Sequence, residues 1–375
     1  MPNLYAKLNL IMSHNTLHDP IIVALASDDN VIVGLVATMT SVILATDKEQ
    51  RLDFHLLDTG MSAKHRDQIV EFFIVYPNVT VVFHTVDVSI FEKAGAPMFV
   101  HGWSAYARIL LHKIIPDERC VYIDIDFLVL KDLREIWATD LHGFAFAACT
   151  NTSKGETPNA DRLGTFWNLE STEDLSQFTY HNSGFLFINL DFWRDFGFAE
   201  KAIELLEKYE LCEKYGNRMP FEDQGILNYI FRGKIKTLSP EWNYTPWWTR
   251  PVLRDANYHF TSQFKPWSPG FFLPVEQIWW AMYNNHIKPR WDVAKETRGN
   301  AKRMLLWLRM YGIPCIMPVF YCFLRKVFKS DKRHRRENNL ANLLKMVRKT
   351  LIFGPERESK DTITFYRNKF KNTKP

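Results

Sequence analysis

Residues 121–130 of the 375-residue chain read VYIDIDFLVL. Apolar residues on both sides of Asp124 and Asp126 predict a buried strand that ends in a pair of carboxylates. Because side chains alternate between the two faces of a strand, we expect both aspartates to point to the same side. Two carboxylates near a core repel each other. Either the strand runs out into solvent there, or a divalent cation compensates the charges, and the pair by itself leaves both alternatives open.

The residues around this stretch alternate between predicted strands and helices. Short apolar runs predict strands at 21–26, 52–58 and 79–86. Helices are predicted at 31–46, 62–76, 104–113, 196–210 and 223–231. This alternation is typical of βαβ units, so we expect an α/β fold with a mostly parallel central sheet.

Polar residues follow two of these strands at their carboxyl ends, which is where α/β sheets bind ligands. Asp28 and Asn30 come directly after the first strand, and the aspartate pair comes late in its own strand. Neither a GxGxxG nor a GxxxxGK[ST] loop follows the first strand, which disfavours a dinucleotide-binding fold and a P-loop enzyme.

Cysteines and the first residues indicate the compartment. The five cysteines are scattered and none forms a CxxC pair, which argues against a disulfide framework or a zinc site and favours a reducing environment. Residues 1–20 carry a short apolar patch broken by His and Asn, without a small-residue cleavage site. We therefore expect a cytoplasmic protein.

Charge is distributed unevenly along the chain. Residues 301–375 contain 19 Lys and Arg but 5 Asp and Glu, whereas the first 300 residues contain 28 and 37. The uncharged run 310–324 is shorter than a bilayer span and includes two prolines, and the basic cluster KRHRR follows at 332–336.

We divide the chain into a catalytic domain at 20–275 and a basic, aromatic, largely helical C-terminal region at 276–375. That region is predicted to attach peripherally to an anionic membrane surface. Packing of the apolar run on the catalytic domain is the alternative, and we expect no nucleic acid partner.

Seven sequence blocks, in order along residues 21–267, make the chain resemble glycosyltransferase family 8. This family includes bacterial lipopolysaccharide galactosyl- and glucosyltransferases and glycogenin. The blocks are ASDDN (26–30), SAYAR (104–108), YIDIDFLVL (122–130), HNSGFLFINLDFWR (181–194), FEDQGILN (221–228), PEWN (240–243) and HFTSQFKPW (259–267).

The resemblance implies a nucleotide-sugar-binding fold of the GT-A type and a retaining, metal-dependent hexosyltransferase. It implies Mn²⁺, with Mg²⁺ as a possible substitute, and a UDP-sugar donor, UDP-galactose or UDP-glucose. The expected acceptor is an oligosaccharide or a lipid-linked glycan in lipopolysaccharide or other surface-glycan assembly. Membrane attachment would place the protein on the cytosolic face of the membrane.

The resemblance also assigns roles to individual residues. Asp124 and Asp126 match the family's metal-binding DxD, and His259 matches the histidine that completes the protein's share of the metal shell. The donor-binding positions are Asp28, Asn30, Arg108 and Lys265, and those around the transferred sugar are Asn182, Asp223 and Gln224. Because an amide is a poor nucleophile, we expect front-side attack by the acceptor hydroxyl rather than a covalent intermediate on Gln224.

Three positions depart from the family's usual pattern, which has Tyr at Val31, Gly at Ser262 and Asp at Gly225. We expect these changes to affect donor preference more than the class of reaction. A metal-dependent phosphohydrolase is one rival interpretation, but its aspartate pair normally follows the first strand. A membrane-binding protein with a degenerate transferase body is the other, against which the complete set of Asp pair, His259 and Lys265 argues.

Overall fold

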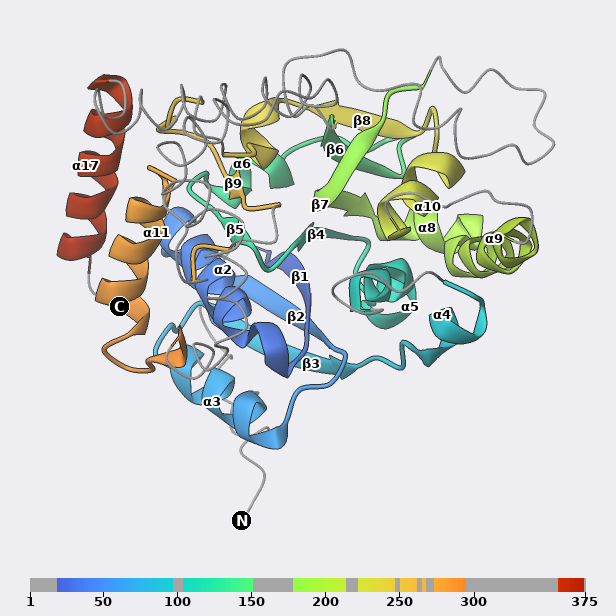
Figure 1. The fold of residues 1–375 in the computed structure, drawn as a ribbon, viewed down its shortest axis with the longest axis horizontal. Helices are drawn as coiled ribbons and strands as arrows, with labels where there is room; N and C mark the ends of the chain where they lie inside the picture. Colours follow the sequence, from blue (N-terminus) through green and yellow to red (C-terminus); the bar gives the residue numbers. More distant parts are fainter. Residues whose placement is uncertain are drawn as a thin grey trace, which may run out of the picture.

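The computed structural model describes residues 19–96, 104–150, 178–213, 222–246, 250–261, 265–267, 273–294 and 357–373. A seven-stranded mixed sheet lies at its centre, in the order β3-β2-β1-β4-β7-β6-β8 (Figure 1). β1 (Ile21–Ser27), β2 (Leu52–Asp58), β3 (Val79–Thr85) and β4 (Arg119–Ile123) are parallel. β7 (His181–Asn189) runs antiparallel to β4 and to β6 (Phe146–Thr150), and β8 (Ile235–Leu238) is parallel to β6. The predicted mostly parallel α/β sheet is confirmed.

Helices cover both faces of the sheet, so β1 is buried along its whole length. Its alternate residues therefore belong to two separate hydrophobic clusters. The cluster on the face of Val23 includes residues of α2 (Ile32–Ala45), α3 (Ala63–Phe73), α11 (Glu276–Met282) and the π-helix η5 (Tyr283–Ile287), and α17 (Arg357–Asn372) joins it by packing on α11. On the face of Ala24 pack α4 (Ser89–Lys93), the 3₁₀ helix η2 (Ser104–Leu110), α5 (Leu111–Ile114), α8 (Leu190–Phe196), α9 (Phe198–Glu213) and α10 (Glu222–Ile230).

Most predicted elements agree with the structure, and two helices differ from expectation. The helix predicted at 104–113 is a 3₁₀ helix followed by the single α-turn of α5. The helix predicted at 196–210 is interrupted at Gly197, whose φ of 66° ends α8 before α9 begins. A side chain at this left-handed position would be strained, so the glycine separates the two helices.

The prediction that Asp124 and Asp126 share one face of a strand is wrong. β4 ends at Ile123, and residues 124–126 form a turn that leaves the sheet before β5 (Phe127–Leu128). The turn is held by backbone bonds, because Asp124 N–H donates to Gly184 O (2.8 Å) and Phe260 N–H donates to Asp126 O (3.0 Å). β5 then pairs with β9 (Tyr258–His259) instead of with β4. The two carboxylates converge because the chain turns, not because side chains alternate.

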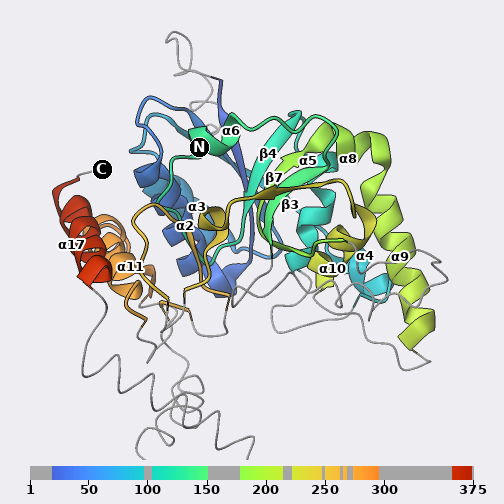
Figure 2. The ribbon, with the colours of Figure 1, turned by 90° about the horizontal axis from the view of Figure 1, so that it is seen from above.

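The C-terminal helix α17 packs beside α11, as both views of the ribbon show (Figures 1 and 2). Tyr366 donates from its hydroxyl to Arg254 O, and Ser359 Oγ accepts from Val252 N–H at 2.9 Å. Both contacts support the segment that leads into β9.

The apolar run 310–324 and the basic cluster 332–336 lie outside the described residues, and the division at residue 275 stays a prediction. Within the described part of the chain no helix is long and apolar enough to cross a membrane.

Two phenylalanines of α17 provide a matched test of this packing. Phe370 is 2% exposed, whereas Phe365 is 39% exposed and lies against the guanidinium of Arg254. Phe370→Ala should lower the free energy of unfolding by about 3–5 kcal/mol, the usual loss for a buried aromatic ring. Phe365→Ala should lower it by about 1 kcal/mol or less, the size of an exposed cation–π contact. Urea denaturation of both variants measures the difference, and equal losses would contradict the packing of α17.

Candidate active site

The turn that carries the two aspartates rests on α2. Thr38 Oγ1 lies 2.8 Å from Ile125 O and 3.0 Å from Phe127 O, and it donates to these carbonyl groups. A Cβ atom at Gly34 would lie 2.7 Å from Ile125 O and 2.8 Å from the indole of Trp267. Glycine is therefore needed for this close approach. α2 thus positions both the aspartate turn and the tryptophan that ends the last sequence block.

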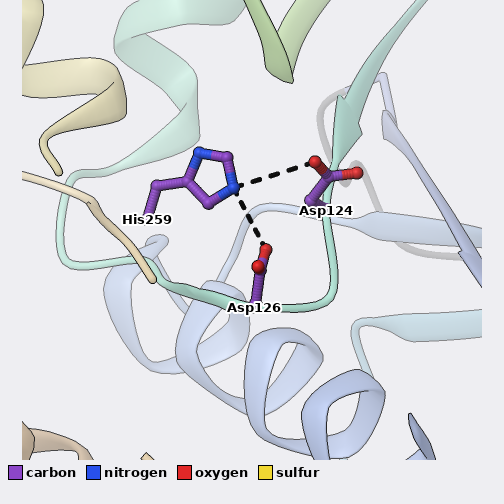
Figure 3. Close-up of side chains that lie close together, drawn as sticks. All are labelled: Asp124, Asp126 and His259. Atoms are coloured by element: carbon purple, nitrogen blue, oxygen red, sulfur yellow. Dashed lines mark ion pairs between the residues drawn. The ribbon is translucent and has the colours of Figure 1, made fainter. Parts of the chain in front are cut away.

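Asp124, Asp126 and His259 form one cluster (Figure 3). His259 Nε2 lies 3.8 Å from Asp124 Oδ2 and 3.2 Å from Asp126 Oδ1. Pairing of β5 with β9 puts His259 opposite Phe127, and the two rings stack with centroids 4.3 Å apart. The three side chains predicted as metal ligands are therefore brought together by the structure.

Each carboxylate turns one oxygen toward His259 and uses the other elsewhere. Asp124 Oδ1 accepts from Arg108 Nη2 at 2.8 Å and from the Tyr122 hydroxyl at 3.1 Å. Asp126 Oδ2 accepts from Lys265 Nζ at 2.5 Å, whereas its Oδ1 is buried and has no hydrogen-bond partner. Burial raises the pKa of Asp126, but the ammonium group of Lys265 outweighs burial and holds the pKa well below the ordinary value.

The donor atoms of this cluster fit a divalent cation. Asp124 Oδ2, Asp126 Oδ1 and His259 Nε2 are two oxygens and one imidazole nitrogen, a set that suits Mn²⁺ or Mg²⁺. The buried Asp126 Oδ1 lacks the partner that a buried carboxylate oxygen normally requires, and a cation would supply one. A Cβ at Gly184 would lie 2.2 Å from the His259 ring and 2.9 Å from Asp124 Oδ2. A residue with a side chain at position 184 would therefore collide with His259 and Asp124, and glycine leaves the room that both need.

Arg108 connects the cluster of Asp124, Asp126 and His259 with Asp223. Its side chain is 4% exposed, and its Nε lies 3.0 Å from Asp223 Oδ2 while Nη2 donates to Asp124. Nη1 donates to Ser183 O at 2.6 Å, and the guanidinium lies over the Tyr122 ring at 4.4 Å. Because Arg108 Nε–H donates to Ala105 O at 3.0 Å, its contact with Asp223 Oδ2 is a buried ion pair without a hydrogen bond.

Gln224 and Asn182 are joined to each other and to the backbone of β7 by hydrogen bonds. Gln224 Oε1 accepts from Ser183 N–H at 3.0 Å and from Asn182 Nδ2 at 3.1 Å. Asn182 Oδ1 in turn accepts from Gly184 N–H (2.9 Å) and from Asn243 Nδ2 (2.7 Å). Asn243 ends the 3₁₀ helix η4 (Pro240–Asn243), and sequence reasoning assigned it no role although its PEWN block was recognised. Asp223 lies in the first turn of α10, which begins at Glu222, so it is not the N-cap of that helix.

Asp28 and Asn30 lie at the carboxyl end of β1, in and beside the 3₁₀ helix η1 (Asp29–Val31). Asn30 donates to Asp28 twice, from its backbone N–H at 2.9 Å and from Nδ2 at 3.2 Å. Asp29 between them accepts from Ser62 N–H and His65 Nδ1. No described contact joins Asp28 or Asn30 to the cluster of Asp124, Asp126 and His259, so their donor-binding role stays a prediction.

A family model decides the class of protein. Residues 22–269 match the model of Glycosyl transferase family 8. The chain belongs to this family. It is therefore a glycosyltransferase of a retaining family with the GT-A fold, as the seven sequence blocks predicted.

Individual family 8 relatives agree with this assignment. A putative glycosyltransferase of Haemophilus influenzae is 30% identical over 56% of this chain and 59% of its own length. A lipopolysaccharide 1,2-glucosyltransferase of Escherichia coli is 25% identical, covering 64% of this chain and 71% of that protein. The chain thus spans less than two thirds of the Haemophilus protein.

A solved structure of an active-site mutant of LgtC is 26% identical, with a TM-score of 0.54 and coverage of 66% of this chain and 90% of that chain. The galactosyltransferase LgtC in complex with donor and acceptor sugar analogs is 24% identical, with a TM-score of 0.57 and coverage of 75% and 98%. This likeness supports the GT-A fold.

Of the three departures from the family 8 pattern, Val31 ends η1, Gly225 lies inside α10, and Ser262 lies outside the described residues.

The buried Asp223 predicts a pH dependence for the family 8 reaction. Burial raises the pKa of Asp223 to about 6, with Arg108 lowering it and Asp124 raising it. In the predicted role of Asp223, its carboxylate form accepts hydrogen bonds from sugar hydroxyls, and protonation below pH 6 removes that form. At saturating Mn²⁺ we therefore expect kcat/KM for the donor to fall about tenfold per pH unit below pH 6. A pH–rate profile measures this, and a flat profile down to pH 5 would contradict the role of Asp223.

Proposed function

We propose that this chain transfers a hexose from UDP-galactose or UDP-glucose to a hydroxyl group of a glycan acceptor, with retention of the donor's α-configuration. The observation that carries the proposal is the cluster of Asp124, Asp126 and His259 beside Lys265, at the carboxyl end of β4 in a family 8 fold. This is the edge of an α/β sheet at which ligands bind.

The cluster supplies a site for the diphosphate of the donor. Asp124 Oδ2, Asp126 Oδ1 and His259 Nε2 would hold Mn²⁺, or Mg²⁺ in its place. When bound, this ion would stabilise the negative charge that develops on UDP as it leaves. Lys265 is held beside the cluster by Asp126 Oδ2 and by Phe260 O (2.7 Å), so its ammonium group adds a fixed positive charge for the diphosphate.

The hydrogen bonds of Gln224 support attack from the front side. Its carbonyl oxygen already accepts from Ser183 N–H and Asn182 Nδ2, so it is not free to bond the anomeric carbon. In the proposed step the acceptor oxygen bonds to the anomeric carbon as the bond from that carbon to the phosphate oxygen breaks. The hydroxyl proton passes to the leaving phosphate, and no charged group of the protein needs to accept it. Asp223 and Asn182 would hold the sugar during transfer.

The screen that tests this function measures UDP release from several UDP-hexoses with Mn²⁺ and candidate oligosaccharide and lipid-linked acceptors. We expect release that depends on both UDP-galactose or UDP-glucose and an acceptor, and an α-linked product by NMR. A β-linked initial product would contradict the mechanism. Release from none of the UDP-hexoses above the rate without protein would contradict the proposed donor class.

We further propose a lipid-linked glycan acceptor in lipopolysaccharide or other surface-glycan assembly, with the chain attached to the cytosolic face of the membrane. A relative that is a lipopolysaccharide glucosyltransferase supports the pathway, and the basic residues of the C-terminal region support the attachment. Because each cation near an anionic surface contributes about 1 kcal/mol, the four Lys and Arg of 332–336 would contribute roughly 4 kcal/mol together.

Attachment is tested without truncation, because a chain that ends near residue 300 would also lack α17. The variant changes Lys332, Arg333, Arg335 and Arg336 to Gln. Its matched control also introduces Gln, at four exposed lysines of the catalytic domain: Lys48, Lys64, Lys201 and Lys208. Co-sedimentation with anionic vesicles at low salt should fall strongly in the first variant and little in the control. Equal losses, or no binding by the wild-type chain, would contradict the attachment.

A further inference from the structure

Asn243 lies between the metal-binding cluster and the sugar-binding side chains. Its Oδ1 lies 2.9 Å from His259 Nδ1, and its Nδ2 donates to Asn182 Oδ1 at 2.7 Å. Asn182 Nδ2 continues the chain of hydrogen bonds to Gln224 Oε1. One asparagine therefore touches both a predicted metal ligand and the residue that leads to Gln224.

Two backbone N–H groups determine the direction of every hydrogen bond in the series from His259 through Asn243 and Asn182 to Gln224. A backbone N–H can only donate, so Ser183 N–H identifies Gln224 Oε1 as an oxygen, and Gly184 N–H does the same for Asn182 Oδ1. Asn182 must then donate from Nδ2 to Gln224, and Asn243 must donate from Nδ2 to Asn182. This leaves the oxygen of Asn243 facing His259, which must donate to it from Nδ1.

The direction of these bonds decides which nitrogen of His259 faces the two aspartates. With its proton on Nδ1, a neutral imidazole presents the lone pair of Nε2 to Asp124 and Asp126. A lone pair aimed at two carboxylates is unfavourable unless a cation lies among them. The orientation of Asn243 is thus suited to metal binding by Nε2.

We propose that Asn243 is a positioning residue that holds His259 as the Nδ1–H tautomer for the metal and ties that ligand, through Asn182, to Gln224. This inference rests on the proposed function. Partners of metal-binding histidines typically contribute about 10–100-fold to metal affinity. Asn243→Ala should therefore weaken Mn²⁺ binding by roughly 10–100-fold, measured by electron paramagnetic resonance without donor.

Asn243→Asp separates the two roles of the residue. Its carboxylate still accepts from His259 Nδ1, so Mn²⁺ affinity should stay close to that of the wild type. It cannot donate to Asn182 Oδ1, and this oxygen would instead face another acceptor. The link to Gln224 is then lost, so kcat should fall although the metal binds. Asn78→Ala is the matched control, since Asn78 donates to Gln50 O at the far edge of the sheet and should leave both quantities unchanged.

A spectroscopic measurement tests the tautomer independently of catalysis. In the wild-type protein loaded with Mg²⁺, the ¹⁵N shifts of His259, assigned with the variant His259→Gln, should be those of a protonated Nδ1 and an unprotonated Nε2. An unprotonated Nδ1 would overturn the inference, and so would wild-type Mn²⁺ affinity in Asn243→Ala or equal losses of affinity in the Ala and Asp variants. If the wild-type chain transferred no hexose, the proposed function would fail while the Nδ1 signal still decided the role of Asn243.

Discussion

Asp126→Asn should lower the rate of hexose transfer by roughly 100-fold or more, because a loss of about 3 kcal/mol of transition-state stabilisation corresponds to that factor. The amide has almost the same shape as the carboxylate but lacks the charge that pairs with Lys265 and that the predicted Mn²⁺ ion would require. Asp126 Oδ1 is the oxygen without a hydrogen-bond partner, so its replacement acts directly on the predicted metal site. Chelation of the metal by EDTA should reproduce the loss in the wild-type protein.

Asp132→Asn is the control for this substitution. Asp132 is in the same segment of the chain but caps α6 (Leu133–Trp137), where it accepts from Arg134 N–H at 2.9 Å. Its replacement changes the charge by the same amount and should leave transfer unaffected. Circular dichroism should show folded protein for both variants. Full turnover by Asp126→Asn in the presence of EDTA would contradict the metal assignment.

Arg108→Met should lower the free energy of unfolding by about 3–5 kcal/mol, the loss expected when one partner of a buried ion pair is removed. Methionine fills much of the space but leaves Asp124 and Asp223 without their shared guanidinium. Arg108→Lys should restore little of this loss, because a single ammonium cannot replace three guanidinium nitrogens that separately contact Asp124, Asp223 and Ser183 O. Transfer should fall in both variants.

Double substitution and a surface arginine complete the test. Arg108→Met combined with Asp223→Asn should be less destabilised than the sum of the two single variants, since the second change removes a carboxylate left unpaired by the first. Arg119→Met is the control, because Arg119 lies over the Trp137 ring at 4.5 Å near the surface and should cost about 1 kcal/mol or less. Additive losses for the Arg108 and Asp223 pair would contradict the bridge, as would a similar loss in Arg119→Met.

Local patterns in the sequence predicted the parts of the site that depend on neighbouring residues. Apolar runs located β1, β2 and β3, and the acidic pair was recognised beside a strand because its charges interrupt an apolar stretch. The seven blocks located His259, Lys265 and Gln224 by resemblance. The geometry inferred for Asp124 and Asp126 was wrong, since strand alternation was applied to residues that form a turn.

The sequence by itself determined the α/β fold class, the family and the chemical types of the candidate ligands, because these follow from short patterns of apolar and charged residues. Only the tertiary structure decided which atoms meet. Lys265 and Asp126 are 139 residues apart yet form an ion pair, Arg108 bridges two carboxylates from different elements, and Asn243 links His259 to Asn182. Such contacts depend on the register of β5 with β9 and of β4 with β7, and on the close approach of α2 at Gly34. These are properties of packing between distant segments, which spacing along the chain does not encode.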